Sequence, residues 1–201
     1  QVAILGGAFN PVTKSHIGIA ELVLKASRWA DEVWLMPSYK HMDGKNMVSA
    51  EHRINMLKLA TKNDGRIKVS EYEVENKLGG ETYFMLSKLL NDSMYENYRF
   101  AFVIGLDRAN YISSWYNSDE LLKLDVPFIV VPRNGYERDV NVNWYLNNHH
   151  IYLEKGADLI PEFSSTKARE VIKRGTESYN EIKEFMNEDV LKYIIDNHLY
   201  C

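Results

Sequence analysis

Short apolar segments alternate with segments of helical spacing along most of this 201-residue chain. The apolar segments span four to seven residues, the length of single strands. Strands and helices that alternate in this way form βαβ units, which build a mostly parallel sheet with helices on both faces. We therefore predict an α/β fold with a doubly wound, mostly parallel sheet. The predicted strands are Val2–Leu5, Glu32–Met36, Arg66–Tyr72, Phe100–Ile104, Phe128–Val131 and His150–Leu153, and the predicted helices are Ile17–Trp29, 49–60, Glu81–Leu90, Ser118–Leu124, Ser164–Arg174 and Asn187–His198.

The chain is predicted to form one Rossmann-like domain over residues 1–201. Its length suits a single domain, and no linker rich in Pro, Gly or Ser divides it. The last two predicted helices lie within residues 164–201, which we expect to form a small C-terminal helical subdomain. The polar and basic segment Ser38–Met47 is predicted to be a loop.

Composition excludes several classes of protein. The net charge of −4 argues against a general nucleic-acid binder, which usually carries a basic face. The single cysteine, Cys201, excludes a disulfide framework and a cysteine-based metal site. Neither a run of 18 apolar residues nor a signal-peptide pattern is found. We expect a cytoplasmic protein with no nucleic-acid or membrane partner.

The first predicted strand leads into a pattern that is typical of a phosphate site. Gly6 and Gly7 follow it, and their backbone N–H groups can approach an anion closely because glycine has no Cβ. The next helix start adds unpaired N–H groups and a positive dipole end. His16 lies near that start, three residues after Thr13. The GxxxxGK[ST] and GxGxxG patterns are both absent, so the combination favours nucleotidyl transfer over a kinase-like mechanism; the alternative is an ordinary turn with an incidental histidine.

A second candidate for anion binding lies near the end of the chain. Ser164, Ser165 and Thr166 precede Lys167 and Arg169 at helical spacing. Hydroxyl groups can cap the helix while the cations form charge-assisted contacts with an anion. The alternative is plain N-capping of a surface helix.

Three segments follow the ends of predicted strands: Gly6–His16, Gly105–Asp107 and Pro132–Gly135. Ligands of open α/β sheets bind outside the carboxyl ends of the strands, where the strand order reverses. We therefore expect these segments to surround one crevice.

Together, the two anion-binding candidates resemble the signatures GxFxPxxxGH and SSTxxR of a nucleotidyltransferase superfamily, with Ser15 in place of the usual glycine before the histidine. Within that superfamily the chain most resembles the nicotinate or nicotinamide mononucleotide adenylyltransferases. Further matches to those enzymes are Glu51-His52-Arg53, Thr82-Tyr83, Gly105-Leu106-Asp107, Trp115-Tyr116-Asn117, Pro132–Tyr136 and Leu191–Tyr200.

The resemblance implies that the 5′-phosphate of a pyridine mononucleotide attacks the α-phosphorus of ATP, which forms a dinucleotide of NAD biosynthesis and releases pyrophosphate. Mg²⁺ is expected to enter with ATP, so no residue is predicted as a dedicated metal ligand. Enzymes of this kind often assemble, so a homo-oligomer is a further expectation. The implied catalytic residues are His16, Arg169 and Thr13; the implied ATP-binding residues are Gly6, Gly7, Ala8, Phe9, His16, Gly105, Asp107, Ser164, Ser165, Thr166 and Arg169; and the implied mononucleotide-binding residues are Thr82, Trp115 and Arg133, with Arg53 as a weaker candidate.

Two alternatives stay open from the sequence. Phosphopantetheine adenylyltransferases and cytidylyltransferases share both signatures, and a regulatory module could bind ATP or NAD without turnover. The sequence also leaves open whether the pyridine carries an acid or an amide group, because a backbone N–H could read that difference.

Overall fold

A computed structural model describes residues 1–40 and 46–201, so part of the loop predicted at Ser38–Met47 lies outside the described residues. The described part contains a six-stranded sheet in the order β3-β2-β1-β4-β5-β6. All five strand pairs are parallel, which confirms the predicted doubly wound α/β fold. The order reverses between β1 and β4. The strands are β1 Val2–Gly7, β2 Glu32–Pro37, β3 Ile67–Val69, β4 Phe100–Gly105, β5 Phe128–Val131 and β6 Ile151–Tyr152.

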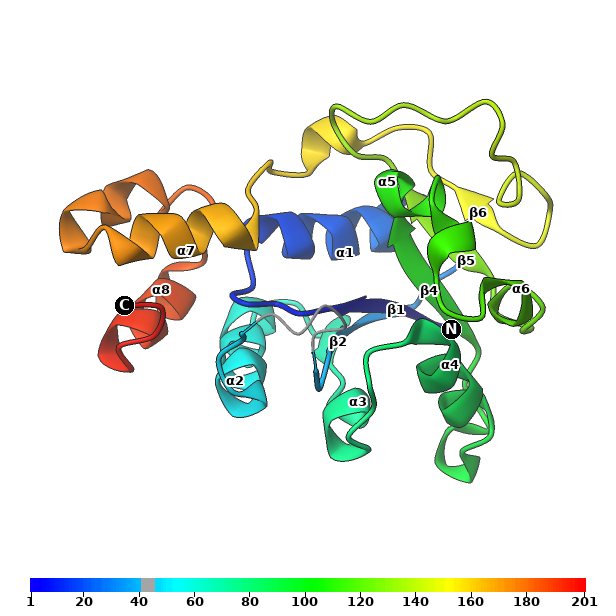
Figure 1. Cartoon of the computed structure of the whole chain (residues 1–201), viewed down its shortest axis with the longest axis horizontal. Coiled ribbons are helices and arrows are strands. Elements are labelled where there is room, and N and C mark those ends of the chain that lie inside the picture. The colour runs from blue at the N-terminus through cyan, green and yellow to red at the C-terminus, as the bar shows by residue number, and fades with distance from the viewer. Residues whose placement is uncertain (41–45) are drawn as a thin grey trace.

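Helices cover both faces of the sheet, with α1 on one side and α4 on the other (Figure 1). Within residues 1–40 and 46–201, none of them has the length and apolar character needed to cross a membrane. The α-helices are α1 Lys14–Ala26, α2 Ala50–Thr61, α3 Tyr72–Glu75, α4 Thr82–Leu90, α5 Leu106–Ala109, α6 Ser118–Leu121, α7 Ser165–Lys173 and α8 Glu188–Asp196, and the 3₁₀ helices are η1 Ser93–Tyr95, η2 Ile112–Ser114, η3 Ala157–Leu159 and η4 Thr176–Glu181.

The two faces of the sheet bury two separate hydrophobic clusters. Successive strand residues point to opposite faces, so Ala3 and Leu5 belong to one cluster and Val2 and Ile4 to the other. Because both faces are buried, the strands are nearly continuous apolar runs, as is usual in parallel sheets. These apolar runs are the pattern from which the strands were predicted.

The C-terminal helices pack into the first of these clusters. Ala168 and Val171 of α7 and Ile194 of α8 are buried in the same cluster as Ala3 of the central strand. Asn187 caps α8, as the sequence indicates, by accepting hydrogen bonds from the backbone N–H groups of residues 189 and 190. Figure 1 shows α7 and α8 at the end of the molecule that lies opposite the N-terminus. This is the end toward which β1 runs.

Several element boundaries differ from the sequence prediction. The strand predicted as far as Tyr72 ends at Val69, because Tyr72 begins the four-residue helix α3. Helices this short show no periodicity of their own, and α5 was missed for the same reason. The first helix begins earlier than predicted, at Lys14, and ends earlier, at Ala26.

Candidate functional site

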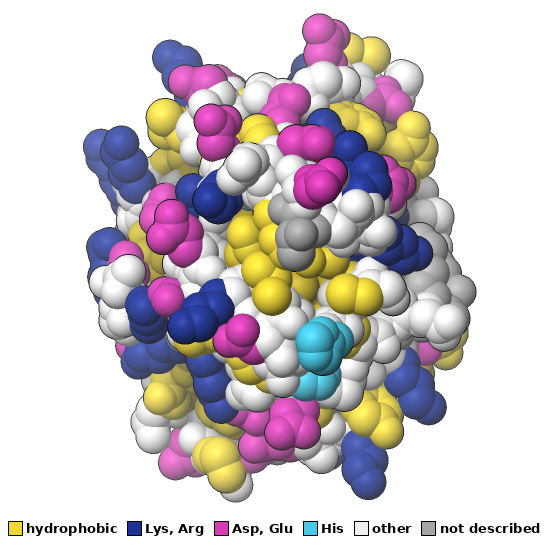
Figure 2. Space-filling view, turned by 90° about the vertical axis from the view of Figure 1, so that its left-hand side faces the viewer, with side chains coloured by type: hydrophobic (Ala, Val, Ile, Leu, Met, Phe, Trp, Pro, Cys, Tyr) yellow, Lys and Arg dark blue, Asp and Glu magenta, His cyan; other side chains and the backbone are white. Residues whose placement is uncertain are grey.

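The carboxyl ends of the central strands bring the predicted site segments together. β1 ends at Gly7, and its neighbour β4 ends at Gly105. β5 lies beside β4 and leads into Pro132 and Arg133. The sequence-predicted segments therefore lie at the point where the strand order reverses. Figure 2 looks onto this end of the molecule, where Lys and Arg side chains and Asp and Glu side chains surround a central group of hydrophobic ones.

The loop between β1 and α1 turns at Phe9 rather than at the glycines. We expected Gly6 and Gly7 to form the turn, but β1 continues through both of them. Phe9 has the left-handed backbone conformation, with φ of 46°. Its ring is 1% exposed and lies 3.4 Å from the position that a Cβ on Gly7 would take. The ring of Phe9 thus lies against Gly7 in the core, and its side chain is not open to a ligand.

His16 is held in one orientation by the residue that caps its helix. The backbone N–H of Thr13 donates to Nδ1 of His16 at 3.0 Å, and the Thr13 hydroxyl oxygen lies 2.9 Å from the same nitrogen. The Thr13 hydroxyl also donates to the carbonyl of Phe163 at 3.2 Å. Because Nδ1 accepts a hydrogen bond, the proton of the neutral imidazole is on Nε2. Burial lowers the pKa of His16 to about 4, so this neutral form is the relevant one near pH 7.

The two predicted phosphate segments are joined by direct hydrogen bonds. The Ser165 hydroxyl donates to the carbonyl of Pro11 at 2.8 Å. The Arg169 guanidinium donates to the carbonyl of Asn10 at 2.7 Å and to the Thr166 hydroxyl at 3.2 Å. Ser164 caps α7 by accepting from a backbone N–H at 3.1 Å. Residues that are about 150 positions apart in sequence therefore form one constellation.

Ser15 adds a second connection between the same parts of the chain. Its hydroxyl contacts the carbonyl of Pro161 and bonds the carbonyl of Phe163 at 3.0 Å, and it accepts from the backbone N–H of Phe163 at 3.1 Å. The residue that departs from the usual glycine thus ties α1 to the segment that leads into α7.

Asp107 and Arg133 form an ion pair just beyond the carboxyl ends of β4 and β5. The Arg133 guanidinium lies 2.6 Å from the Asp107 carboxylate and 5.2 Å from the ring centre of Tyr136. A Cβ on Gly105 would lie 2.6 Å from the same carboxylate, so a larger residue here would displace the Asp107 side chain. Within the part of the chain that the structure describes, no group of three His, Cys, Asp or Glu residues could hold a metal ion.

Thr82 and Trp115 belong to segments that pack on the second hydrophobic cluster of the sheet. Thr82 is the first residue of α4, and Trp115 rests edge-on against Phe102 of β4, with ring centres 6.5 Å apart. Their sequence neighbours Phe84 and Tyr116 have ring centres 5.2 Å apart, so the two segments are adjacent. Among residues 1–40 and 46–201, no hydrogen bond connects these two side chains to the phosphate constellation.

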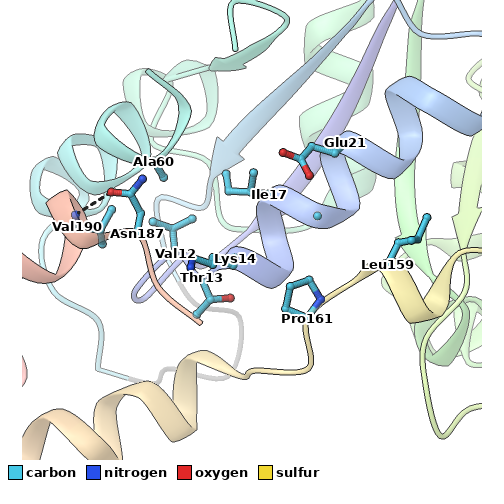
Figure 3. A pocket seen from close by; sticks show the side chains of 11 residues that line it. Val12, Thr13, Lys14, Ile17, Glu21, Ala60, Leu159, Pro161, Asn187 and Val190 are labelled. Atoms are coloured by element: carbon cyan, nitrogen blue, oxygen red, sulfur yellow. Dashed lines mark hydrogen bonds between the residues drawn. The ribbon is translucent and has the colours of Figure 1, made fainter. Parts of the chain in front are cut away.

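A cavity of about 300 Å³ lies beside the first two turns of α1 (Figure 3). It is bordered by α1, the end of α2, the start of α8 and residues 159–161, and Lys14 and Glu21 are its charged lining residues. Thr13 is the one predicted site residue that lines it. The cavity therefore adjoins the site through Thr13, while Ser164, Ser165 and Arg169 do not line it.

A family model matches most of the chain. The model of the cytidylyltransferase-like family matches residues 4–171, from β1 into α7, and so includes both signatures. The chain belongs to the cytidylyltransferase-like family. The resemblance inferred from the two signatures is therefore confirmed, and this cytidylyltransferase-like protein is an enzyme of the nucleotidyltransferase class.

Relatives match this cytidylyltransferase-like chain over its whole length. A probable nicotinate-nucleotide adenylyltransferase of Lactococcus lactis subsp. lactis is 34% identical over 205 residues, which cover 100% of this chain and 95% of the relative. One from Endomicrobium trichonymphae is 32% identical over 200 residues, with coverages of 100% and 98%. The solved structure of Plasmodium falciparum nicotinic acid mononucleotide adenylyltransferase complexed with NaAD has a TM-score of 0.79 at 25% identity and covers 99% of this chain and 96% of that one.

Sequence reasoning did not identify the buried hydrogen bonds that hold the phosphate loop in place. Asn10 occupies a variable position of the signature, yet its side chain is 5% exposed and hydrogen-bonded. Arg53 was a weak candidate for substrate binding, but it is 1% exposed and donates to the carbonyls of Ala8 and Val48 at 2.9 and 3.2 Å. Burial raises the pKa of the nearby Glu73 to about 7. The periodicity of the sequence carries no signal for these contacts.

The protonation of His16 in this cytidylyltransferase-like protein can be measured directly. Since burial lowers its pKa to about 4, we expect the imidazole to stay neutral from pH 8 down to about pH 5. A ¹H–¹³C NMR titration of histidine-labelled protein, assigned by comparison with His16→Ala, should show an unchanged His16 signal over this range. A midpoint above pH 6 would contradict the lowered pKa, and a midpoint above pH 7 would make His16 mainly a cation at neutral pH.

Proposed function

We propose that this enzyme transfers the AMP part of ATP to nicotinate mononucleotide and releases pyrophosphate. The observation that carries the proposal is the pair of hydrogen bonds from Ser165 and Arg169 to the loop that precedes His16. These bonds hold the two candidate phosphate-binding segments together, so that hydrogen-bond donors from both can act on the same phosphates. The full-length relatives named as nicotinate-nucleotide adenylyltransferases support the choice of substrates.

The proposed reaction needs no nucleophile from the protein. An oxygen of the mononucleotide 5′-phosphate forms a bond to the α-phosphorus of ATP. The bond between that phosphorus and the oxygen bridging to the β-phosphate breaks, and pyrophosphate leaves with the electron pair. The enzyme contributes alignment of the two phosphates and stabilisation of the charge that develops on them.

His16 and Arg169 are the side chains we place on the reacting phosphates. Nε2 of neutral His16 donates to the α-phosphate, and Thr13 acts through His16 by fixing its ring. Arg169 uses two donor groups on Asn10 and Thr166 and has further N–H groups for the departing pyrophosphate. The Gly6–Ala8 backbone and the hydroxyl of Ser164 complete the phosphate contacts. Ser165 gives its hydroxyl hydrogen to Pro11 and contributes its backbone N–H at the start of α7.

Mg²⁺ is proposed to enter with ATP. The carboxylate of Asp107 lies at the crevice, but it is paired with Arg133 at 2.6 Å and is therefore not a free metal ligand. A metal ion that keeps most of its ligands from phosphate and water fits this chemistry. When bound, such an ion would neutralise phosphate charge, while Asp107 and Gly105 would contact the adenosine.

We propose that Trp115 stacks on the pyridine ring, with Thr82 and Arg133 on the rest of the mononucleotide. Trp115→Ala should then raise the KM for the mononucleotide about tenfold, the usual effect of removing one stacked base. The KM for ATP should stay within about twofold, since Trp115 lies apart from the phosphate constellation. Steady-state kinetics with each substrate varied in turn measures both values, and Trp115→Phe is the matched control that keeps a stacking ring. Equal changes in both KM values would remove Trp115 from the mononucleotide site.

The test of the proposed function compares substrates. Purified protein is given ATP and Mg²⁺ with nicotinate mononucleotide, nicotinamide mononucleotide or phosphopantetheine, and with CTP in place of ATP. We expect pyrophosphate and a dinucleotide from the two pyridine substrates, with the higher kcat/KM for the acid. Turnover only with phosphopantetheine or CTP would favour the other branches of the family. Calorimetric binding of ATP without any product would indicate a regulatory module.

A further inference from the structure

A buried asparagine in the phosphate loop connects four parts of the chain. The side-chain oxygen of Asn10 accepts from the backbone N–H of Val48 at 3.2 Å and from the hydroxyl of Tyr200 at 2.9 Å. Its backbone carbonyl accepts from the Arg169 guanidinium at 2.7 Å. Asn10 is thus the point at which the segment after α8 meets the site.

The backbone after α8 is shaped to bring Tyr200 to this point. The helix ends in a Schellman motif, in which Leu199 N–H bonds to the carbonyl of Ile194 and His198 N–H to that of Ile195, at 3.0 and 3.1 Å. His198 has a left-handed φ of 52° and Tyr200 one of 66°. This conformation is uncommon for side chains of this size, so the surrounding contacts must hold it in place. Leu199 is 8% exposed and anchors the turn in the core.

The environment keeps the Tyr200 hydroxyl as a donor. Burial raises the pKa of Tyr200, against the opposing influence of the Arg169 and Arg53 guanidinium groups. The protonated hydroxyl has one hydrogen to give, and the oxygen of Asn10 accepts it. This bond fixes which way the Asn10 amide faces, because the same oxygen also accepts from Val48.

We propose that Tyr200 is a positioning residue for AMP transfer, which holds Asn10 so that the phosphate loop and Arg169 are aligned on ATP. The inference rests on the proposed function. Tyr200 lies on a segment outside both signatures, and it acts through Asn10 on the position of Arg169 relative to the phosphate loop. Arg53 of α2 holds the loop through the carbonyls of Ala8 and Val48. Tyr200, which follows α8, holds the same loop through Asn10.

Tyr200→Phe removes only the hydroxyl and tests the proposal. We expect the KM for ATP to rise about threefold to tenfold, the usual net worth of one hydrogen bond, with the KM for the mononucleotide unchanged. A merely structural role would lower the amount of active enzyme and leave both KM values as they are. The matched control is Tyr193→Phe on α8, whose hydroxyl bonds His52 and Asn55 of α2 at 2.9 and 3.0 Å, away from the loop.

A double-mutant cycle and a binding measurement make the outcome decisive. If Tyr200 acts through Asn10 on Arg169, Tyr200→Phe should have little further effect in the Arg169→Ala background. Calorimetry with α,β-methylene-ATP should show the same threefold to tenfold weakening in Tyr200→Phe and none in Tyr193→Phe. If the wild-type protein makes no dinucleotide, the proposed function fails. The difference in affinity for α,β-methylene-ATP between wild type and Tyr200→Phe still tests the positioning role of Tyr200. A KM and a Kd within twofold of wild type would overturn the positioning role.

Discussion

Replacement of His16 by alanine is expected to lower kcat about 100-fold to 1,000-fold, the usual cost of losing one preorganised donor to a transition-state oxyanion. The imidazole is oriented by Thr13 through Nδ1, and burial keeps it neutral, so Nε2 is a fixed donor that needs no rearrangement as charge develops. The KM for both substrates should change much less than kcat. Initial rates of pyrophosphate release measure all three parameters.

The matched control for this variant is His149→Ala. His149 is an exposed histidine in the segment before β6, and its substitution should leave kcat within about twofold of wild type, as is usual for surface positions. Circular dichroism and the thermal midpoint should show that His16→Ala is folded. A His16→Ala enzyme with near-normal kcat would remove His16 from the phosphates.

Replacement of Arg169 by alanine is expected to lower kcat/KM for ATP about 100-fold, because the site loses a charge-assisted phosphate contact and the loop loses its bond to Asn10. Arg169→Lys should recover only a small part of this loss. A lysine ammonium is a point charge on a flexible stem and cannot reach Asn10, Thr166 and a phosphate at the same time. Steady-state kinetics with varied ATP provides the values.

Arg174→Ala is the control for the charge on α7. Arg174 caps the same helix and pairs with Glu181 on the surface at 2.7 Å, so its removal changes the net charge equally without touching the loop. We expect kcat/KM for ATP within about twofold of wild type, in line with other surface substitutions. Equal losses in the two variants would mean that Arg169 acts only through the overall charge of the helix.

The local parts of the fold could be predicted from the sequence, because they depend on neighbouring residues. Ser49 caps α2 and Asn187 caps α8, as their positions before apolar periodic segments indicate. The fully apolar strands also predict a sheet that is covered on both faces. The turn at Phe9 could not be predicted, because a left-handed backbone is uncommon for phenylalanine and the burial of its ring is a tertiary contact.

The site was predicted only as separate pieces. Spacing placed His16 and Arg169 in two anion-binding segments, and the family resemblance joined them. The bond that unites them physically runs from Arg169 to the carbonyl of Asn10 across 159 positions, and no local pattern encodes it. The bond from Tyr200 to Asn10 spans 190 positions. Such contacts arise from the packing of α7 and α8 against the sheet, which no local sequence pattern reveals.

The position of the label from [α-³²P]ATP tests the central claim most directly, because adenylyl transfer moves the α-phosphorus and no other. Purified protein is incubated with the labelled nucleotide, Mg²⁺ and nicotinate mononucleotide, and the products are separated by chromatography. We expect the label in the dinucleotide and an equal amount of unlabelled pyrophosphate. Label that appears only in ADP or AMP, with free phosphate in place of pyrophosphate, would contradict transfer at the α-phosphorus.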